Sequence, residues 1–127
     1  MALQWHDPAE DVTDAARVRV FGRLADAWKL SVAQRAALLD SNPRTYHRWK
    51  RDPQVARLSA DQRTRIAYLV RIYVDLHAIF GDGGDANAWV HRPNAAYGGE
   101  PPLSELVDGG MAELLRVAAE VALAAGS

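Results

Sequence analysis

The segment that decides the fold is SVAQRAALLDSNPRTYHRWKR, residues 31–51. It opens with a capping-box pattern, in which the Ser31 oxygen can accept from the backbone N–H three residues on while the Gln34 side chain reaches back. A short helix is therefore expected over about residues 32–39.

A second short helix is expected over about residues 43–51. Asn42 is an N-cap candidate, and Pro43 suits the first helical position, where its missing N–H costs nothing. Pro53 should end the helix, because proline disfavours helical geometry in the residue before it. Two short helices joined by a polar turn and flanked by longer ones match the helix-turn-helix arrangement, whose second helix enters the DNA major groove.

The flanking segments are also helical in pattern, so the predicted fold class is all-α. Apolar residues recur at spacings of three and four from about Pro8 to Trp28, including Val12 and Val20. A capping box at Ser59 starts a long apolar stripe, and a glycine loop ends it after Phe80. Further helices are expected near residues 85–90, 102–107 and 111–125, with an irregular stretch over 91–101. We divide the chain into a DNA-binding unit, 1–58, and a C-terminal unit, 59–127.

Charge is distributed unevenly along the chain, although the total is only −1. Up to Asp14 there are four acids and no base. Residues 17–65 hold twelve bases against four acids, a formal +8, whereas residues 66–127 hold three bases against eight acids, a formal −5. A basic block of this kind is typical of phosphate binding. The alternative is that these arginines belong to solvated helix faces.

The second helix of the pair has the side chains that base reading needs. Arg44, Arg48 and Arg51 share one face, and arginine can hydrogen-bond guanine bidentately. The expected DNA-binding residues are Arg44, Thr45, His47, Arg48 and Arg51. Tyr46 and Trp49 lie on another side and should pack against the preceding helices.

Catalysis finds no support in the sequence, and neither a cofactor nor a metal is expected. There is no cysteine, and the four histidines are scattered; Asp75 and His77 are two apart on a helix and point in different directions. The loop from Gly81 to Asp85 lacks the lysine of a phosphate loop and the spaced acids of a calcium loop. With no signal peptide and no long apolar run, the protein is expected in the cytoplasm.

The region from Ala88 to Gly110 resembles the C-terminal domain of antitoxins of the Xre/MbcA/ParS type. That pattern has a tryptophan-led short helix, a Pro-Asn step, a glycine before a Pro-Leu pair, and a closing helix that ends near a glycine. The matching residues are Trp89, Pro93, Asn94, Gly99, Pro102, Leu103, Gly110 and Gly126. Most of these positions also have a structural explanation as turn and helix-start residues. The acidic stretch up to Asp14 is outside the pattern, and could be a cap, an arm or a dimerisation element.

The resemblance implies a partner, a RES-domain toxin that consumes NAD. In that family the antitoxin's last helix and tail lie against or inside the toxin's active-site cleft. Carried over to this chain, the toxin-binding residues would be Glu113, Arg116, Glu120, Ala124, Ala125, Gly126 and Ser127. The net negative charge of the C-terminal part would suit a basic cleft that binds a dinucleotide.

Two functions are compatible with these patterns. The first is an antitoxin that blocks its toxin and represses its own operon by binding operator DNA. The second is a helix-turn-helix transcription regulator with a C-terminal dimerisation domain and no toxin. A homodimer, and a higher hetero-oligomer with the toxin, are expected, because symmetric operators are read by two-fold proteins.

Overall fold

The computed structural model describes residues 12–126, and within this range it is all-α, as the sequence predicts. Most of the acidic N-terminal stretch and Ser127 lie outside the described residues. The α-helices are α1 (Asp14–Ala27), α2 (Val32–Leu38), α3 (Pro43–Arg51), α4 (Ala60–Phe80), α5 (Gly84–Ala88), α6 (Pro102–Asp108) and α7 (Met111–Ala124). Three 3-10 turns join them: η2 (Pro53–Val55), η3 (Trp89–His91) and η4 (Ala95–Tyr97).

The two short helices form at the predicted residues for the predicted reasons. Both hydrogen bonds of the Ser31 capping box are present: Ser31 N donates to Gln34 Oε1 at 2.9 Å, and Gln34 N donates to Ser31 Oγ at 3.1 Å. At the start of α3 the Asn42 side chain accepts from Thr45 N at 2.9 Å. The turn between the helices places Asp40 at a φ of 48°, in the left-handed region.

The first helix differs from the prediction in its start and in its inward face. It begins at Asp14, because the Thr13 side chain caps it by accepting from Ala16 N, so Val12 and Thr13 precede the helix. The predicted helical residues before Val12 lie outside the described part of the chain. Val12 and Val20 are exposed, and Val18 and Phe21 are buried in their place.

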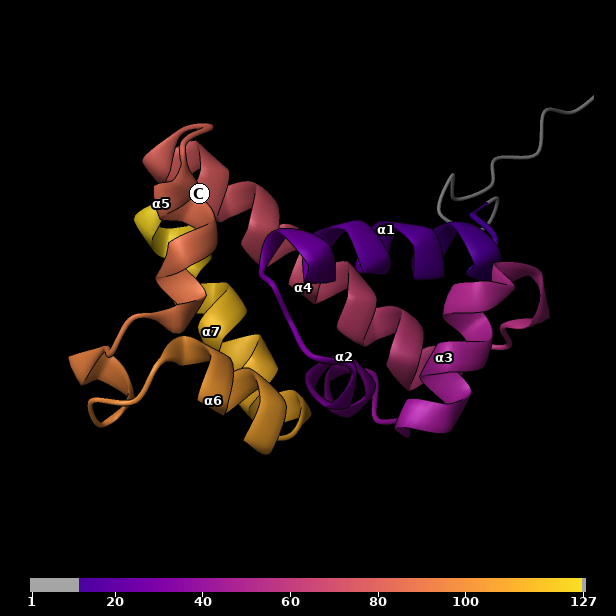
Figure 1. Ribbon diagram of the computed structural model, residues 1–127. Coiled ribbons are helices and arrows are strands. Elements are labelled where there is room, and N and C mark those ends of the chain that lie inside the picture. Colours follow the sequence, from indigo (N-terminus) through magenta and orange to yellow (C-terminus); the bar gives the residue numbers. More distant parts are fainter. Residues whose placement is uncertain (1–11, 127) are drawn as a thin grey trace, which may run out of the picture.

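The long helix α4 is the axis of the molecule (Figure 1). Its first half lies beside α1 and the α2–α3 pair, and its second half lies against α7 and α5. Leu69 and Ile72 are completely buried in a core that runs without a break from α1 to α7. Val74 and Phe80, which the sequence pattern places on the inward stripe, are exposed; Val74 lies on the outer side of α4, and Phe80 borders an open groove beside α7.

The segment after α4 consists of short helices and 3-10 turns, and it includes a close contact between α6 and α7. The helix expected near residues 85–90 divides into α5 and η3, and the stretch expected to be irregular contains η4. Gly109 ends α6, and a Cβ built there would lie 2.5 Å from the Glu105 carbonyl oxygen and 2.6 Å from Glu113 Cβ. Only glycine allows α6 and α7 to meet at this distance. None of the described helices is long and apolar enough to cross a membrane.

Candidate functional site

The inner side of α3 is fixed by two aromatic residues. Tyr46 and Trp49 are buried, which confirms their predicted packing against the preceding helices. The Tyr46 ring meets the Phe21 ring of α1 edge to face, with the centroids 6.0 Å apart. These contacts set which side of α3 faces outward.

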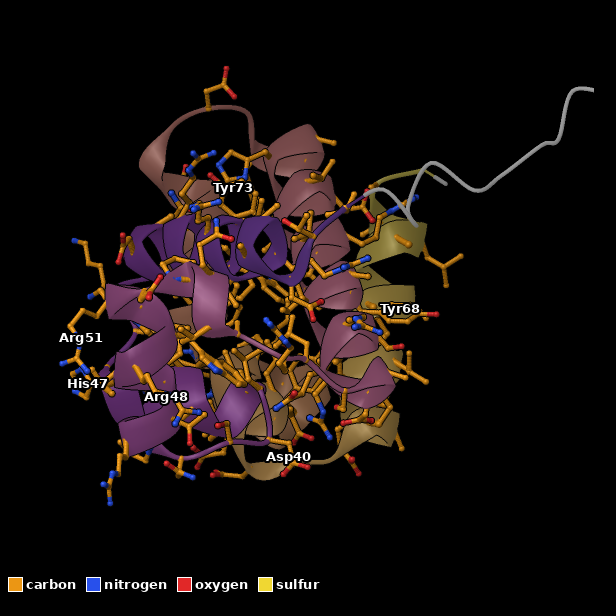
Figure 2. The ribbon with its side chains drawn as sticks, turned by 90° about the vertical axis from the view of Figure 1, so that its right-hand side faces the viewer. Asp40, His47, Arg48, Arg51, Tyr68 and Tyr73 are labelled. Carbon is orange, nitrogen blue, oxygen red and sulfur yellow. The ribbon has the colours of Figure 1, made fainter. Side chains whose placement is uncertain are left out.

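The outward side of α3 is basic and open to solvent. Arg44, His47, Arg48 and Arg51 are exposed, whereas Thr45 is half-buried. In Figure 2 the labelled His47, Arg48 and Arg51 extend away from the body of the protein. Within residues 12–126, none of the three arginines forms an ion pair with an acid. These guanidinium groups are available to an external partner.

Arg35 holds the helix pair together from inside, a role that sequence reasoning missed. This buried arginine donates from Nε to the Leu30 carbonyl at 2.9 Å and from Nη1 to the Tyr46 hydroxyl at 3.5 Å. Its Nη2 lies 2.8 Å from a carboxylate oxygen of Asp26 in α1. One residue of the basic block therefore positions α3 and does not face solvent. The sequence gives no local sign of this, because its partners lie on three different elements.

The motif residues of the C-terminal half mostly build the fold. Pro102 and Leu103 are buried at the start of α6, and Trp89 is half-buried against the core. Asn94 closes a turn by accepting from Ala96 N at 2.9 Å, and Gly99 has a φ of 85°. Pro93 and Gly110 are exposed.

Two of the candidate toxin-binding residues form a cluster with Tyr97. The Tyr97 hydroxyl donates to Glu120, Arg116 lies 3.2 Å from Glu120, and the Arg116 guanidinium sits 5.1 Å from the centre of the Tyr97 ring. Arg116 also donates to the Ala96 carbonyl at 3.1 Å. Burial, and then the bond to Glu120, raise the pKa of the Tyr97 hydroxyl well above its usual value. The cluster ties α7 to the η4 turn.

The end of α7 borders an apolar groove that the sequence did not reveal. Its volume is about 180 Å³, and its lining includes Ile79 and Phe80 at the end of α4 together with Glu120 and Ala124. Leu123, next to Ala124, is 74% exposed. Its exposure could have been inferred, because the buried positions Leu114, Val117 and Val121 turn residue 123 outward.

The remaining candidate toxin-binding residues lie close to the ends of α7. Glu113 is half-buried and accepts from Gly110 N at 2.9 Å, so it caps the start of the helix. Ala124 and Gly126 are exposed, and Ala125 is half-buried. Ser127 lies outside the described residues.

The basic face of α3 and the groove beside α7 lie near opposite ends of α4 (Figure 1). A helix of 21 residues is about 30 Å long, so partners at the two sites would be separated by roughly this distance. Among the described residues no group of three metal-binding side chains occurs.

Residues 7–71 match the model of the antitoxin Xre-like helix-turn-helix domain, and the chain belongs to this family. The matched region contains α1, α2, α3 and the first half of α4. It begins at residue 7, so the expectation that the acidic stretch is outside the family pattern was wrong for residues 7–14. The chain is also 32% identical over 110 residues to an uncharacterized protein, y4oB, of Sinorhizobium fredii (strain NBRC 101917 / NGR234). The alignment covers 83% of this chain and 84% of that protein. The family as a whole implies DNA binding and a toxin partner.

Proposed function

We propose that this protein is the antitoxin of a type II toxin–antitoxin system whose toxin is a NAD-consuming RES-domain protein. In this proposal residues 1–58 bind operator DNA and repress the antitoxin's own operon. Residues 59–127 neutralise the toxin by placing the end of α7 and the tail in its active-site cleft. The observation that carries the proposal is the solvent-exposed basic face of α3, which forms no ion pair within residues 12–126, in a chain of the antitoxin Xre-like family.

DNA binding rests on the geometry of α3. Tyr46 and Trp49 hold the helix by its inner side, so Arg44 and Arg48 can enter a groove without unpacking the core. The test is a mobility-shift titration of the full chain on the duplex upstream of its own gene. We expect Arg44→Ala/Arg48→Ala to lose at least about tenfold in affinity, since one bidentate arginine contributes about 1–3 kcal/mol. Unchanged binding would exclude α3 as the recognition helix.

Toxin binding rests on the end of α7. Leu123 and Ala124 are exposed beside an apolar groove, and the small side chains that follow Leu123 can enter a narrow cleft. The formal −5 of residues 66–127 would complement a cleft that binds an anionic dinucleotide. Glu113, Arg116 and Glu120 already make internal contacts, so the last residues, 123–127, are the segment we propose for the cleft.

The toxin experiment must shorten α7 without removing its buried side. Val121 is the last fully buried residue of the helix, so a chain ending at Ala122 keeps the core. We expect full-length protein to protect cells that express the product of the adjacent reading frame, with growth and cellular NAD maintained, and the shortened chain to fail. Leu123→Glu should fail as well, whereas Leu115→Glu, which changes another exposed leucine earlier on α7, should still protect. Protection by the chain ending at Ala122 would refute occlusion by the tail.

The second candidate function is a helix-turn-helix regulator that has no toxin. It is favoured by apolar side chains on the outer side of α4, where Tyr68 and Val74 are exposed and could meet a second copy in a dimer. A dimer would also suit the antitoxin, so the dimer does not decide between the two. The deciding observation is the neighbouring gene: if its product is harmless to cells and does not bind this protein, the regulator is the correct function.

A further inference from the structure

A second basic feature lies beside α3, in a pocket of about 240 Å³ between α1, α2 and α3. Its rim carries Arg19 and Arg23 from α1 and Lys50 from α3. Gly22 lies between the two arginines in the sequence and offers no side chain to fill the space. Sequence reasoning assigned none of these residues to DNA.

The charge of this pocket is positive and uncompensated. Within residues 12–126, Arg19, Arg23 and Lys50 form no ion pair, and all three are exposed. One acid, Asp26, lines the pocket, but its carboxylate is paired with Arg35 at 2.8 Å. Arg19 and Arg23 are four residues apart on α1, a spacing at which like charges destabilise a helix. An anion bound between them would relieve this repulsion.

The pocket is continuous with the face of α3 that we assign to base reading. Lys50 lines the pocket, and His47 lies one helical turn before it on α3. His47 and Arg51 in turn extend from the outer side of α3 (Figure 2). A duplex that receives α3 in its major groove therefore brings a backbone strand past the pocket. Half to two-thirds of protein–DNA hydrogen bonds go to phosphates and sugars, so a basic surface in this place is expected to bind the backbone.

We propose that Arg19, Arg23 and Lys50 form a clamp for a backbone phosphate of duplex DNA at the edge of the groove entered by α3. This inference rests on the proposed DNA binding by α3. The clamp holds the protein in register on the duplex and adds affinity that does not depend on base sequence. The helix α1, which precedes the helix-turn-helix, thus becomes part of the DNA interface.

The test measures binding of the full chain to two labelled duplexes, its own upstream region and a shuffled duplex of equal length, over a range of salt concentrations. Arg19→Gln/Arg23→Gln should weaken binding to both duplexes by a similar factor, roughly tenfold, and reduce the slope of log affinity against log salt by about one, because one phosphate contact is lost. The control, Lys29→Gln/Arg92→Gln, removes two exposed charges, of which Lys29 lies beside α5 and Arg92 pairs only with the exposed Asp85 among the described residues, and it should change neither quantity. Thermal melting of each variant checks that the fold is intact.

The outcomes separate this inference from the function on which it rests. If Arg19→Gln/Arg23→Gln keeps the affinity and salt slope while Arg44→Ala/Arg48→Ala loses the upstream duplex, the clamp is wrong and DNA binding by α3 stands. A loss confined to the upstream duplex would mean base reading and would also overturn the clamp. If the wild-type chain binds neither duplex, both proposals fail. Binding of inorganic phosphate by calorimetry, with DNA binding of the double variant unchanged, would make the pocket a small-anion site instead.

Discussion

Asp14, in the first turn of α1, accepts two hydrogen bonds from the guanidinium of Arg63 in α4, at 3.0 and 3.2 Å. The same carboxylate accepts from the backbone N–H of Leu58 at 3.1 Å. Asp14 is 44 positions from Leu58 and 49 positions from Arg63 in the chain. This one acid therefore connects α1 to the start of α4. The bonds to Arg63, above all, hold the pKa of Asp14 below its usual value.

Replacing Asp14 by Asn should lower the free energy of unfolding at neutral pH by about 1–2 kcal/mol, because bonds to a charged acceptor are stronger than bonds to an amide. The lowered pKa means that the stabilisation is fully present above pH 3.8 and is lost as the pH falls through the folded-state value. Denaturant titrations of wild type and variant should therefore converge as the pH falls below about 3.8. Asp82→Asn, at an exposed loop position, is the control and should be nearly neutral at every pH. A constant difference between wild type and Asp14→Asn down to pH 2 would contradict this role.

Two glycines should respond in opposite directions to the same substitution. Gly109→Ala puts a methyl group against the Glu105 carbonyl and Glu113, and overpacking of this kind costs about 1–3 kcal/mol. Gly22→Ala adds a methyl group inside α1 with no heavy atom within 4 Å, so it should stabilise the protein by about 0.5–1 kcal/mol. Thermal melting of both variants checks the pair. A stable Gly109→Ala protein would show that α6 and α7 separate easily.

The local elements of the fold could be predicted because their signals are local. Ser31, Asn42 and Ser59 each start a helix through a bond to a residue three positions on, and such bonds depend only on the sequence nearby. The buried side of α1 was harder to predict from the sequence. Val20 and Val18 are equally apolar, and only the direction of the neighbouring helices decides that Val18 is buried.

In the candidate sites, too, features that depend on local spacing could be predicted, and features built from distant segments could not. Arg44, Arg48 and Arg51 share a helix face by spacing alone, so their common exposure could be predicted. Arg35 belongs to the same basic block, yet it is buried, because its partners come from α1, α3 and the end of the α1–α2 connection. The groove beside α7 is likewise made by segments far apart in the chain, and no single stretch of sequence reveals it.

Tyr97 gives a way to separate the structural role of Arg116 and Glu120 from the toxin-binding role predicted for them from the family resemblance. Tyr97→Phe removes the hydroxyl that donates to Glu120 while keeping the ring beneath Arg116, so it should cost about 1 kcal/mol of stability. If Arg116 and Glu120 serve mainly to hold the η4 turn, the variant should still neutralise the toxin. The pKa of Tyr97 is raised, so this tyrosine ionises at higher pH than an ordinary tyrosine. In a spectrophotometric titration, Tyr97→Phe should therefore lack one tyrosine that ionises at high pH in the wild type. A variant that folds normally but no longer protects cells would assign this cluster to the toxin interface.

Arg35 offers the complementary test at the DNA-binding end. Arg35→Ala removes the bonds to the Leu30 carbonyl and the Tyr46 hydroxyl and the pair with Asp26, and it leaves buried polar groups without partners. Because Asp26 is largely exposed, its loss of a partner costs little, and we expect a destabilisation of about 2 kcal/mol, mainly from the buried bonds. Arg35 lines the pocket between α1 and α3, but only 9% of its side chain is exposed and it is already bonded to Leu30, Tyr46 and Asp26. The slope of DNA affinity against salt should therefore stay at the wild-type value in the folded variant, even where affinity falls. Arg57→Ala, which removes an exposed arginine bonded only to backbone carbonyls among the described residues, is the control for charge and should barely change stability. A reduced salt slope in Arg35→Ala would place Arg35, which also lines the pocket between α1 and α3, in contact with the bound phosphate.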